Sequence, residues 1–437
     1  MTTLTKAQSI SLFFTPSISG CISSFASITL IVSIFRSNLK LSNVYRRLIF
    51  FLSVFDIILS ITHALSSLPM PAGTIWGAIG NDVTCGMQGF FTTVGLCGTV
   101  LYSLSLTVYF LLVVKYDMSE ARIKKCVEPF LHAIPLLYSF GVSTYIYATN
   151  NYNAEGRICW IETKPPNCKN DPEVECLSSG NPVVLEWIGG ALPLFGVFLA
   201  NCTILAVIWW SYRSQVRINQ SYASAFAQPN TAPQAIQSDE EEQAGSCCLF
   251  FLTKQCPIIR NCKNSQSNIS HQRRTSVLAE YLSRPSRASA RRLEEIVNRA
   301  AAYVAAYLFS FMFSLIYRVV SAHVSGPTPF IIILLARFFF PLQGFFNVLV
   351  YTYPHVVSYR RNNTECNWFK AFWNVIKSGG DNDQIKTGRR AMRRASIRKR
   401  QRVLEQSEYR QRNGVEGIMN SSGIGERGIN NDATNSS

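Results

Sequence analysis

Long apolar segments alternate with polar ones along most of this chain. Seven segments contain very few charged residues and are long enough to cross a bilayer as a helix, which takes about 20 residues. They cover residues 10–35, 45–68, 86–114, 127–148, 184–210, 299–321 and 328–353. The pattern predicts an all-α membrane protein, a bundle of seven transmembrane helices.

Two prolines inside the predicted spans mark expected helix breaks. Pro193 lies in the fifth span and Pro341 in the seventh. A proline removes one backbone hydrogen bond and kinks the helix. A kink next to Gly344 fits a pivot, and it fits static packing equally well.

The polar segments set the domain organisation. Residues 1–9 are a short N-terminal segment, 10–212 hold the first five spans, and 291–357 hold the last two. Residues 213–290 are rich in Ser, Gln, Asn and Ala, and 378–437 are basic and then rich in Gly, Asn and Ser. These compositions predict disorder in both segments.

Two further helices are expected beside the last two spans. The sequence RRLEEIVNRAAAYVAAY, residues 291–307, predicts that the sixth helix begins a few turns before its apolar part. Residues 358–377 carry Trp368, Phe369, Phe372 and Trp373. That segment predicts an amphipathic helix lying on the inner leaflet.

The distribution of basic residues predicts the orientation. The chain has a net charge of +16, and Lys and Arg gather in segments 36–47, 115–125, 213–290 and the C-terminal tail. Segment 69–84 has none. By the positive-inside rule, residues 1–9 are extracellular, 213–290 form the third cytoplasmic loop, and the C-terminus is cytoplasmic. The charge flanks apolar spans, so we expect membrane lipid and no nucleic acid as its partner.

Four cysteines fall on the predicted outer side, where disulfides persist. Cys85 opens the third span and Cys159 lies in the loop after the fourth, so a bond would tie that loop to the bundle. Two unrelated thiols are the alternative. Cys168 and Cys176 share the same loop, where a local bridge and two free thiols are both open.

Several cytoplasmic positions are candidates for modification. Cys247 and Cys248, next to basic residues, and Cys366, just past the last span, suit acylation. Ser276 in RRTS and Ser396 in RRAS follow paired arginines, the arrangement that basophilic kinases use. The cysteine spacing matches no zinc pattern, and we expect neither a metal nor a cofactor.

A polar set inside the spans is the main functional signal. Asp56 lies in the middle of the second span, where a carboxylate is costly unless it is paired or hydrated. In PLQGFFNVLVY, Gln343, Asn347 and Tyr351 follow at i, i+4 and i+8 and share one helix face. We expect this face to meet Asp56 inside the bundle, through Thr99 or a nearby hydroxyl of the third span. A protonated Asp56 with one structural partner is the alternative.

Three charges lie near the outer ends of the later spans. Glu186 opens the fifth, Arg318 is near the end of the sixth, and Arg337 interrupts the seventh. Such charges could bind an anionic or zwitterionic ligand. An internal Glu–Arg pair or snorkelling side chains are the alternatives.

The chain resembles a G-protein-coupled receptor, close to the border between the cyclic-AMP-receptor-like group of microbial eukaryotes and the secretin-like group. The resemblance is carried by LIFFLSVFDIILS, CGMQGFF, RICWIE and PLQGFFNVLVY in their order and spacing, over about residues 10–215 and 290–375. It implies a disulfide between Cys85 and Cys159. It also implies that Gln343, Gly344, Asn347 and Tyr351 belong to a motif that rearranges on activation.

The chain departs from both groups in places. SLTVYFLLVVKYDMSE ends the third span without the Asp/Glu-Arg-Tyr switch of rhodopsin-like receptors, and residues 1–9 are too few for a hormone-binding ectodomain. The resemblance therefore implies a plasma-membrane receptor for a small extracellular ligand, coupled to a heterotrimeric G protein, with kinases and arrestin-like regulators as further partners.

Other classes fit less well. A small-solute transporter would show an inverted repeat and more charges along a path, and a retinal protein needs a lysine in the sixth or seventh span. An enzyme would need clustered His or acidic residues, whereas the His residues are scattered. A non-signalling seven-helix scaffold stays as the alternative, and we expect no enzymatic activity.

Overall fold

We describe the fold from a computed structural model of the full chain. The structure describes residues 5–166, 168, 174–227, 287–323, 329–363 and 365–379. The predicted modification sites Cys247, Cys248, Ser276 and Ser396 lie outside these residues. The described chain belongs to one compact unit.

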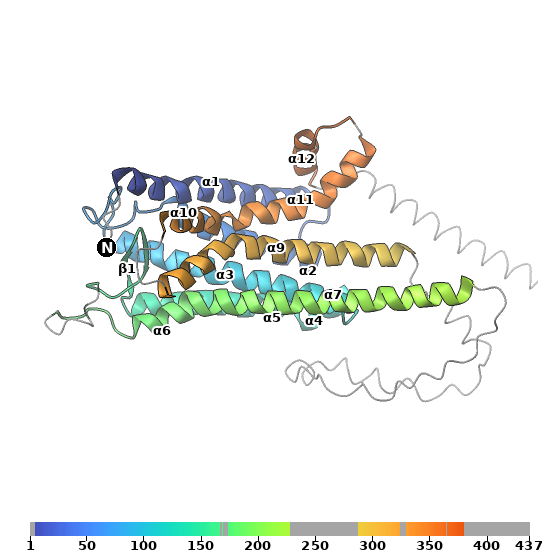
Figure 1. Ribbon diagram of the computed structural model, residues 1–437, viewed down its shortest axis with the longest axis horizontal. Coiled ribbons are helices and arrows are strands. Elements are labelled where there is room, and N and C mark those ends of the chain that lie inside the picture. The colour runs from blue at the N-terminus through green and yellow to red at the C-terminus, as the bar shows by residue number, and fades with distance from the viewer. Residues whose placement is uncertain are drawn as a thin grey trace, which may run out of the picture. The chain divides into compact units, whose positions relative to one another are not determined.

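Helices dominate the described chain, and a long helix coincides with each predicted span (Figure 1). In chain order the helices are α1 (Lys6–Arg36), α2 (Val44–Ala64), α3 (Asp82–Val114), α4 (Glu120–Cys126), α5 (Glu128–Ala148), α6 (Pro182–Glu186), α7 (Leu192–Ala227), α9 (Arg287–His323), α10 (Phe330–Phe339), α11 (Gln343–Asn362) and α12 (Trp368–Lys377). Helix α3 packs against α2, α5, α7 and α9, so it forms the centre of the bundle.

The all-α prediction is incomplete, because the segment between α5 and α6 contains a β-hairpin. Strands β1 (Tyr152–Glu155) and β2 (Ile158–Ile161) pair antiparallel, with Glu155 opposite Ile158. The two-residue turn places Gly156 at φ +59°, a conformation that suits glycine. The hairpin packs on α3, and we call this end of the bundle the hairpin end.

The chain is a multi-pass membrane protein. Five helical stretches are long and apolar enough to cross a membrane: Lys6–Arg36, Asp82–Val114, Pro182–Ile218, Leu293–Ser321 and Phe330–Arg361. The other two predicted spans, on α2 and α5, form helices of 21 residues each but are not among these five. The count of seven spans and the orientation of the termini therefore stay predictions.

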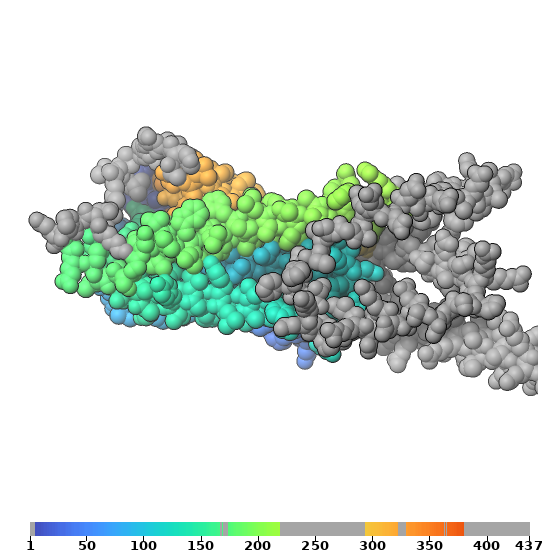
Figure 2. All heavy atoms as spheres, turned by 90° about the horizontal axis from the view of Figure 1, so that it is seen from below, coloured from blue at the N-terminus to red at the C-terminus, as the bar shows by residue number. Residues whose placement is uncertain are grey.

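Apolar side chains on the outer surface fit a lipid environment. On α5, Phe130, Ile134 and Leu137 are exposed, and they follow one another at helical spacing. On α7, Leu199 and Trp210 are exposed as well. Figure 2 shows the face on which α5 and α7 lie. A helix that presents such residues outward needs an apolar surrounding, so these faces are suited to acyl chains.

Both prolines mark breaks where we expected them. A π-turn at Trp187–Ala191 precedes Pro193, and a 3-10 turn at Phe340–Leu342 contains Pro341. Neighbouring side chains satisfy the carbonyls at these breaks. The Cys97 thiol lies 3.3 Å from the Gly189 oxygen, and the Ser60 hydroxyl donates to the Pro341 oxygen at 3.1 Å. The Gly189 carbonyl, which Pro193 leaves without its helix partner, and the Pro341 carbonyl in the 3-10 turn are thereby paired inside the bundle.

Three predicted boundaries are wrong. Disorder was expected from residue 213, but α7 continues to Ala227, and the Gln215 amide donates to the Val114 oxygen of α3 at 3.3 Å. Helix α9 begins at Arg287, one turn before the predicted start. The amphipathic helix is also shorter than 358–377, because α11 runs on to Asn362 and α12 begins only at Trp368.

Close backbone contact between helices depends on glycines. A Cβ on Gly95 of α3 would lie 2.7 Å from the Leu59 nitrogen of α2, and a Cβ on Gly20 of α1 would lie 2.5 Å from the Ser60 oxygen. Backbone atoms cannot rotate away as a side-chain end can. The glycines therefore set the spacing of α1, α2 and α3, as small residues do at membrane helix interfaces.

We expect Gly95→Ala to destabilise the bundle by about 1–3 kcal/mol, because the added methyl group forces α2 and α3 apart. The measurement is the apparent Tm of the purified protein in detergent. Gly141→Ala is the matched control, since a Cβ there meets nothing within 4 Å. An equal Tm for both variants would contradict the close contact.

Candidate functional site

A buried hydrogen-bond network joins α2, α3 and α11 in the middle of the bundle. The Asn347 amide donates to Asp56 Oδ2 at 2.7 Å, and the Thr99 hydroxyl donates to Asp56 Oδ1 at 3.2 Å. The Gln343 amide donates to Asn347 Oδ1 at 3.2 Å. Asp56 and Asn347 are each only 1% exposed. The structure thus brings the predicted polar residues together, with Thr99 in the bridging position.

Gly344 of α11 packs against the network, between Asp56 and α1. A Cβ on Gly344 would lie 2.0 Å from the Ser27 hydroxyl and 3.2 Å from Asp56 Cβ. The hydroxyls of Ser23, Ser27 and Ser53 are buried and have no hydrogen-bond partner within the described chain. Small serines of α1 therefore pack against the network at Gly344 without bonding to it, and the sequence did not single them out because serine is common in membrane helices.

Tyr351, the last predicted member of the set, lies one turn farther along α11. Its side chain is 4% exposed, and its ring centroid is 5.7 Å from that of His355. Tyr351 belongs to the apolar core that also contains Tyr303 of α9 and Phe110 of α3. The structure thus places it between the polar network and the end of the bundle opposite the hairpin.

The expected disulfide is present, and so is the local bridge that the sequence left open. Cys85 of α3 and Cys159 of β2 are bonded, with their Cα atoms 5.3 Å apart, and Cys168 is bonded to Cys176. The Gln88 side chain accepts a hydrogen bond from the Cys159 nitrogen at 3.2 Å. The first bond and this contact hold the hairpin against α3. Free Cys366 is partly buried beside Val375 of α12, and its acylation stays a prediction.

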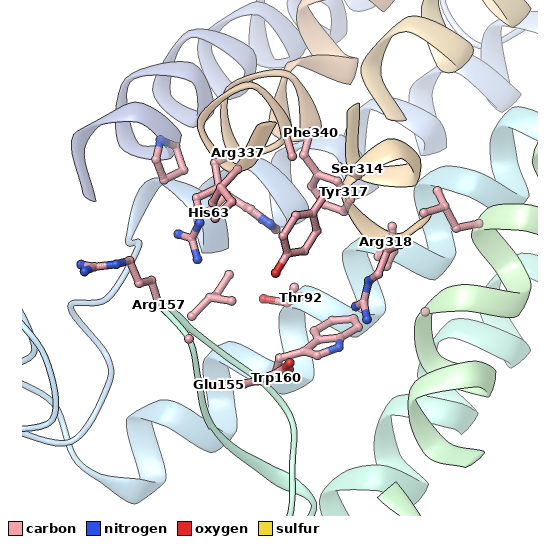
Figure 3. A pocket seen from close by; sticks show the side chains of 18 of the residues that line it. His63, Thr92, Glu155, Arg157, Trp160, Ser314, Tyr317, Arg318, Arg337 and Phe340 are labelled. Carbon is pink, nitrogen blue, oxygen red and sulfur yellow. The ribbon is translucent and has the colours of Figure 1, made fainter. Parts of the chain in front are cut away.

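A cavity of 370 Å³ lies beneath the hairpin, between α1, α2, α3, α7, α9 and α10. That volume is at the lower end of the range for small-molecule sites, about 300–1,000 Å³. Apolar side chains such as Leu96, Trp160 and Phe340 form much of its wall. In Figure 3, Arg337, Tyr317 and His63 approach it from one side, and Glu155 and Trp160 from the other.

The three predicted ligand-binding charges have different roles in the structure. Arg318 of α9 forms a salt bridge with Glu186 of α6, so this pair matches the expected alternative of an internal ion pair. Arg318 still borders the cavity, whereas Glu186 does not. Arg337 of α10 lines the cavity, and no described residue accepts a hydrogen bond from it. Of the three charges, Arg318 and Glu186 thus pair with each other, and Arg337 has no partner among the described residues.

The hairpin adds two charged residues that the sequence analysis missed. Arg157 donates from Nη2 to the Ser9 hydroxyl at 2.8 Å and from Nη1 to the Ser9 oxygen at 3.3 Å. Burial, and after it the negative charge of Glu186, raises the pKa of Glu155 to about 7, while Arg318 opposes the rise. The alternation of the hairpin could have suggested inward-facing residues, but nothing local indicated that they meet α10.

The cavity and the buried network are connected through a few residues. Phe340 lines the cavity, and its ring centroid is 5.0 Å from His63 and 5.2 Å from Phe311 of α9. The next residue, Pro341, accepts from Ser60 of α2, and Gln343 begins α11 and bonds Asn347. A change in the position of Phe340 would therefore reach the Asp56 network through the 3-10 turn.

Comparison with known proteins gives little guidance. Neither protein-family models nor curated proteins give any match to the sequence. Among solved structures, the crystal structure of squid rhodopsin aligns with a TM-score of 0.45 and 13% identity, over 80% of this chain and 83% of that chain. Similarity of this degree assigns neither a family nor a ligand. The resemblance to cyclic-AMP-receptor-like and secretin-like receptors stays a prediction.

We expect Gly344→Ala to destabilise the protein by about 1–3 kcal/mol, because its methyl group overlaps the Ser27 hydroxyl. In the double variant with Ser27→Ala this overlap is gone, so part of the lost stability should return. The apparent Tm values of the two single variants and the double variant measure the coupling. Additive losses would show that α1 and α11 do not meet at this point.

Proposed function

We propose that this chain is a seven-transmembrane cell-surface receptor of the plasma membrane that binds a small extracellular ligand in the cavity and activates a heterotrimeric G protein. The observation that carries the proposal is the connection from Phe340 in the cavity wall to Asn347 and Asp56 in the buried network. A pocket at one end of a bundle that is connected to a polar core suits a protein that changes conformation when a ligand binds.

The physical basis of such signalling is differential affinity for two states of the bundle. A ligand shifts the equilibrium only by as much as it prefers one state over the other. A ligand in contact with Arg337 and Phe340 touches the last turn of α10 and the first residue of the 3-10 turn. The turn lacks regular helix bonds, which makes it the natural place for α10 and α11 to change their angle.

The end of the bundle opposite the hairpin supplies a contact that such a change could break. The hydroxyls of Tyr45 of α2 and Tyr303 of α9 lie 3.0 Å apart, and Tyr303 stacks on Phe110 of α3 with centroids 6.3 Å apart. These contacts hold the inner end of α9 against α2 and α3. In the predicted orientation this end faces the cytoplasm, where separation of α9 would open a surface for a G protein.

The test of the proposal is a G-protein dissociation assay in cells that express the chain. The cells are challenged with nucleotides, amino acids, amines and small acids, and surface delivery is measured in parallel. A ligand-dependent response supports a receptor. Silence across all G-protein families, with the protein present at the surface, would overturn the proposal and favour the scaffold.

We expect Asn347→Ala to reduce the ligand-dependent response on the order of 10-fold, because it removes a hydrogen bond to a buried carboxylate. Asp56→Ala should also change the response. Both variants should still reach the surface. Thr203→Ala is the control, since Thr203 is exposed and bonds only its own helix at the Leu199 oxygen. Wild-type responses from both Asp56→Ala and Asn347→Ala would reject a signalling role for the network.

We expect Tyr303→Phe to raise the basal, ligand-independent signal about 2- to 10-fold, because the variant keeps the ring but loses the hydrogen bond to Tyr45. The same assay without ligand measures it. Tyr109→Phe serves as control, because Tyr109 lies beside Tyr45 in the same aromatic cluster and its described contacts are ring contacts. A basal signal that does not rise would show that the Tyr45–Tyr303 contact does not restrain α9.

A further inference from the structure

The cavity contains one guanidinium group, that of Arg337, that forms neither an ion pair nor a hydrogen bond with any described residue. Of the three arginines that line it, Arg318 is paired with Glu186, and Arg157 is bonded to Ser9 at the start of α1. Arg337 has neither an ion pair nor a hydrogen bond to any described residue. A partly buried cation without a partner is costly, so this arrangement favours an occupant that brings a negative charge.

The nearest opposite charge does not fill this role. Glu155 lies across the cavity from Arg337, and none of the described residues forms a salt bridge or hydrogen bond with its carboxyl group. Its pKa is raised to about 7, so the group is largely neutral in mildly acidic solution. The charges of Arg157 and Arg337 also repel each other. The cavity is therefore net positive, which disfavours amine ligands.

Arg337 enters the cavity beside another polar group. The hydroxyl of Tyr317 on α9 points into the cavity in Figure 3, on the side from which Arg337 enters. No described residue bonds that hydroxyl. Leu96, Trp160, Phe340 and other apolar side chains also line the cavity, alongside polar residues such as Thr92 and Glu155. An occupant with one anionic end and one apolar body would match the cation of Arg337 and these apolar side chains.

We propose that the cavity binds a small monocarboxylic acid with an aromatic or branched apolar body, its carboxylate held by the Arg337 guanidinium and the Tyr317 hydroxyl. Arg337 can donate two parallel hydrogen bonds to a carboxylate, and the hydroxyl can donate a third. The body then lies against Trp160 and Phe340. As a statement about signalling this rests on the proposed receptor function, whereas binding itself is tested on the isolated protein.

The experiment measures binding to the purified full-length protein in lipid nanodiscs. The probes are 3-phenylpropanoic acid, its primary amide, 3-phenylpropylamine and phenyl phosphate, with 3-methylbutanoic acid as a smaller carboxylate. We expect saturable binding of one or both acids and at least 10-fold weaker binding of the amide and the amine. Equal affinity for acid and amide would overturn the proposal, as would no saturable carboxylate binding at millimolar concentration. Tighter binding of phenyl phosphate than of the acids would overturn the carboxylate as the preferred anion and indicate a phosphate group.

Variants then locate the anion. Arg337→Gln should weaken binding of the acid about 10- to 100-fold, and Tyr317→Phe about 2- to 10-fold, with the amide unchanged in both. Arg337→Lys should fall between wild type and Arg337→Gln, because it keeps the charge but loses the paired geometry. Arg361→Gln, an exposed position in the last turn of α11, is the control. Wild-type affinity in both Arg337→Gln and Tyr317→Phe would place the ligand elsewhere.

The pH dependence gives a second readout. A carboxylate ligand stays ionised above about pH 6, whereas Glu155 gains a proton as the pH falls through about 7. Affinity should therefore rise up to about 10-fold from pH 8 to pH 6. Arg318, Arg337, Arg157, Glu186, Glu162 and His63 are the other titratable or charged groups that face Glu155 or line the cavity. Glu155→Gln should flatten the profile. A profile that stays steep in this variant, or a wild-type affinity that falls from pH 8 to pH 6, would contradict the proposed charge balance.

The two levels of the proposal can fail separately. Arg337-dependent acid binding without any G-protein response would leave the ligand class in place and overturn the receptor function. If the amide elicits the cellular response as well as the acid does, and Arg337→Gln leaves that response intact, the receptor function stands and the proposed ligand class is overturned. Measuring both on the same variants distinguishes these outcomes.

Discussion

A carboxylate held in the middle of an apolar bundle constrains most of this structure. Asp56 is shielded from water on all sides, and removing a charge from water is costly unless hydrogen-bond donors replace it. Asn347 and Thr99 supply those donors from two other helices. Because the bonds require α2, α3 and α11 to meet at one depth, they fix the register of three helices at once. Gly344 allows α1 to join the same layer.

The second constraint is backbone pairing in a region without water. Side chains from neighbouring helices bind backbone carbonyls at the two proline breaks. Cys97 reaches the π-turn before α7, and Ser60 reaches the 3-10 turn before α11. The breaks are therefore integrated into the packing, and the irregular turns lie where the cavity meets the core. Flexibility and structural support are combined at the same residues.

The sequence allowed the network to be predicted but not the full cavity. The spacing of Gln343 and Asn347 defines one helix face, and a charge in an apolar span must find a partner, so the meeting with Asp56 followed from local information. The pairing of Arg318 with Glu186 did not follow from local information, because it depends on how α6 and α9 are rotated about their axes. The same limit applies to Glu155, which reaches the cavity only through the position of the hairpin. The continuation of α7 beyond residue 212 was missed because its composition resembles that of a linker.

The hairpin has a kinetic consequence for any molecule in the cavity. One of its strands is fixed covalently to α3 through Cys159. The turn at Gly156 and Arg157 borders the cavity, and among the described residues it bonds α1 through the hydrogen bonds of Arg157 to Ser9. The hairpin over the cavity is thus held by a disulfide on one side and by hydrogen bonds on the other. How long an occupant stays would be set by how often Arg157 releases Ser9. Residence time and affinity would then be determined by different residues.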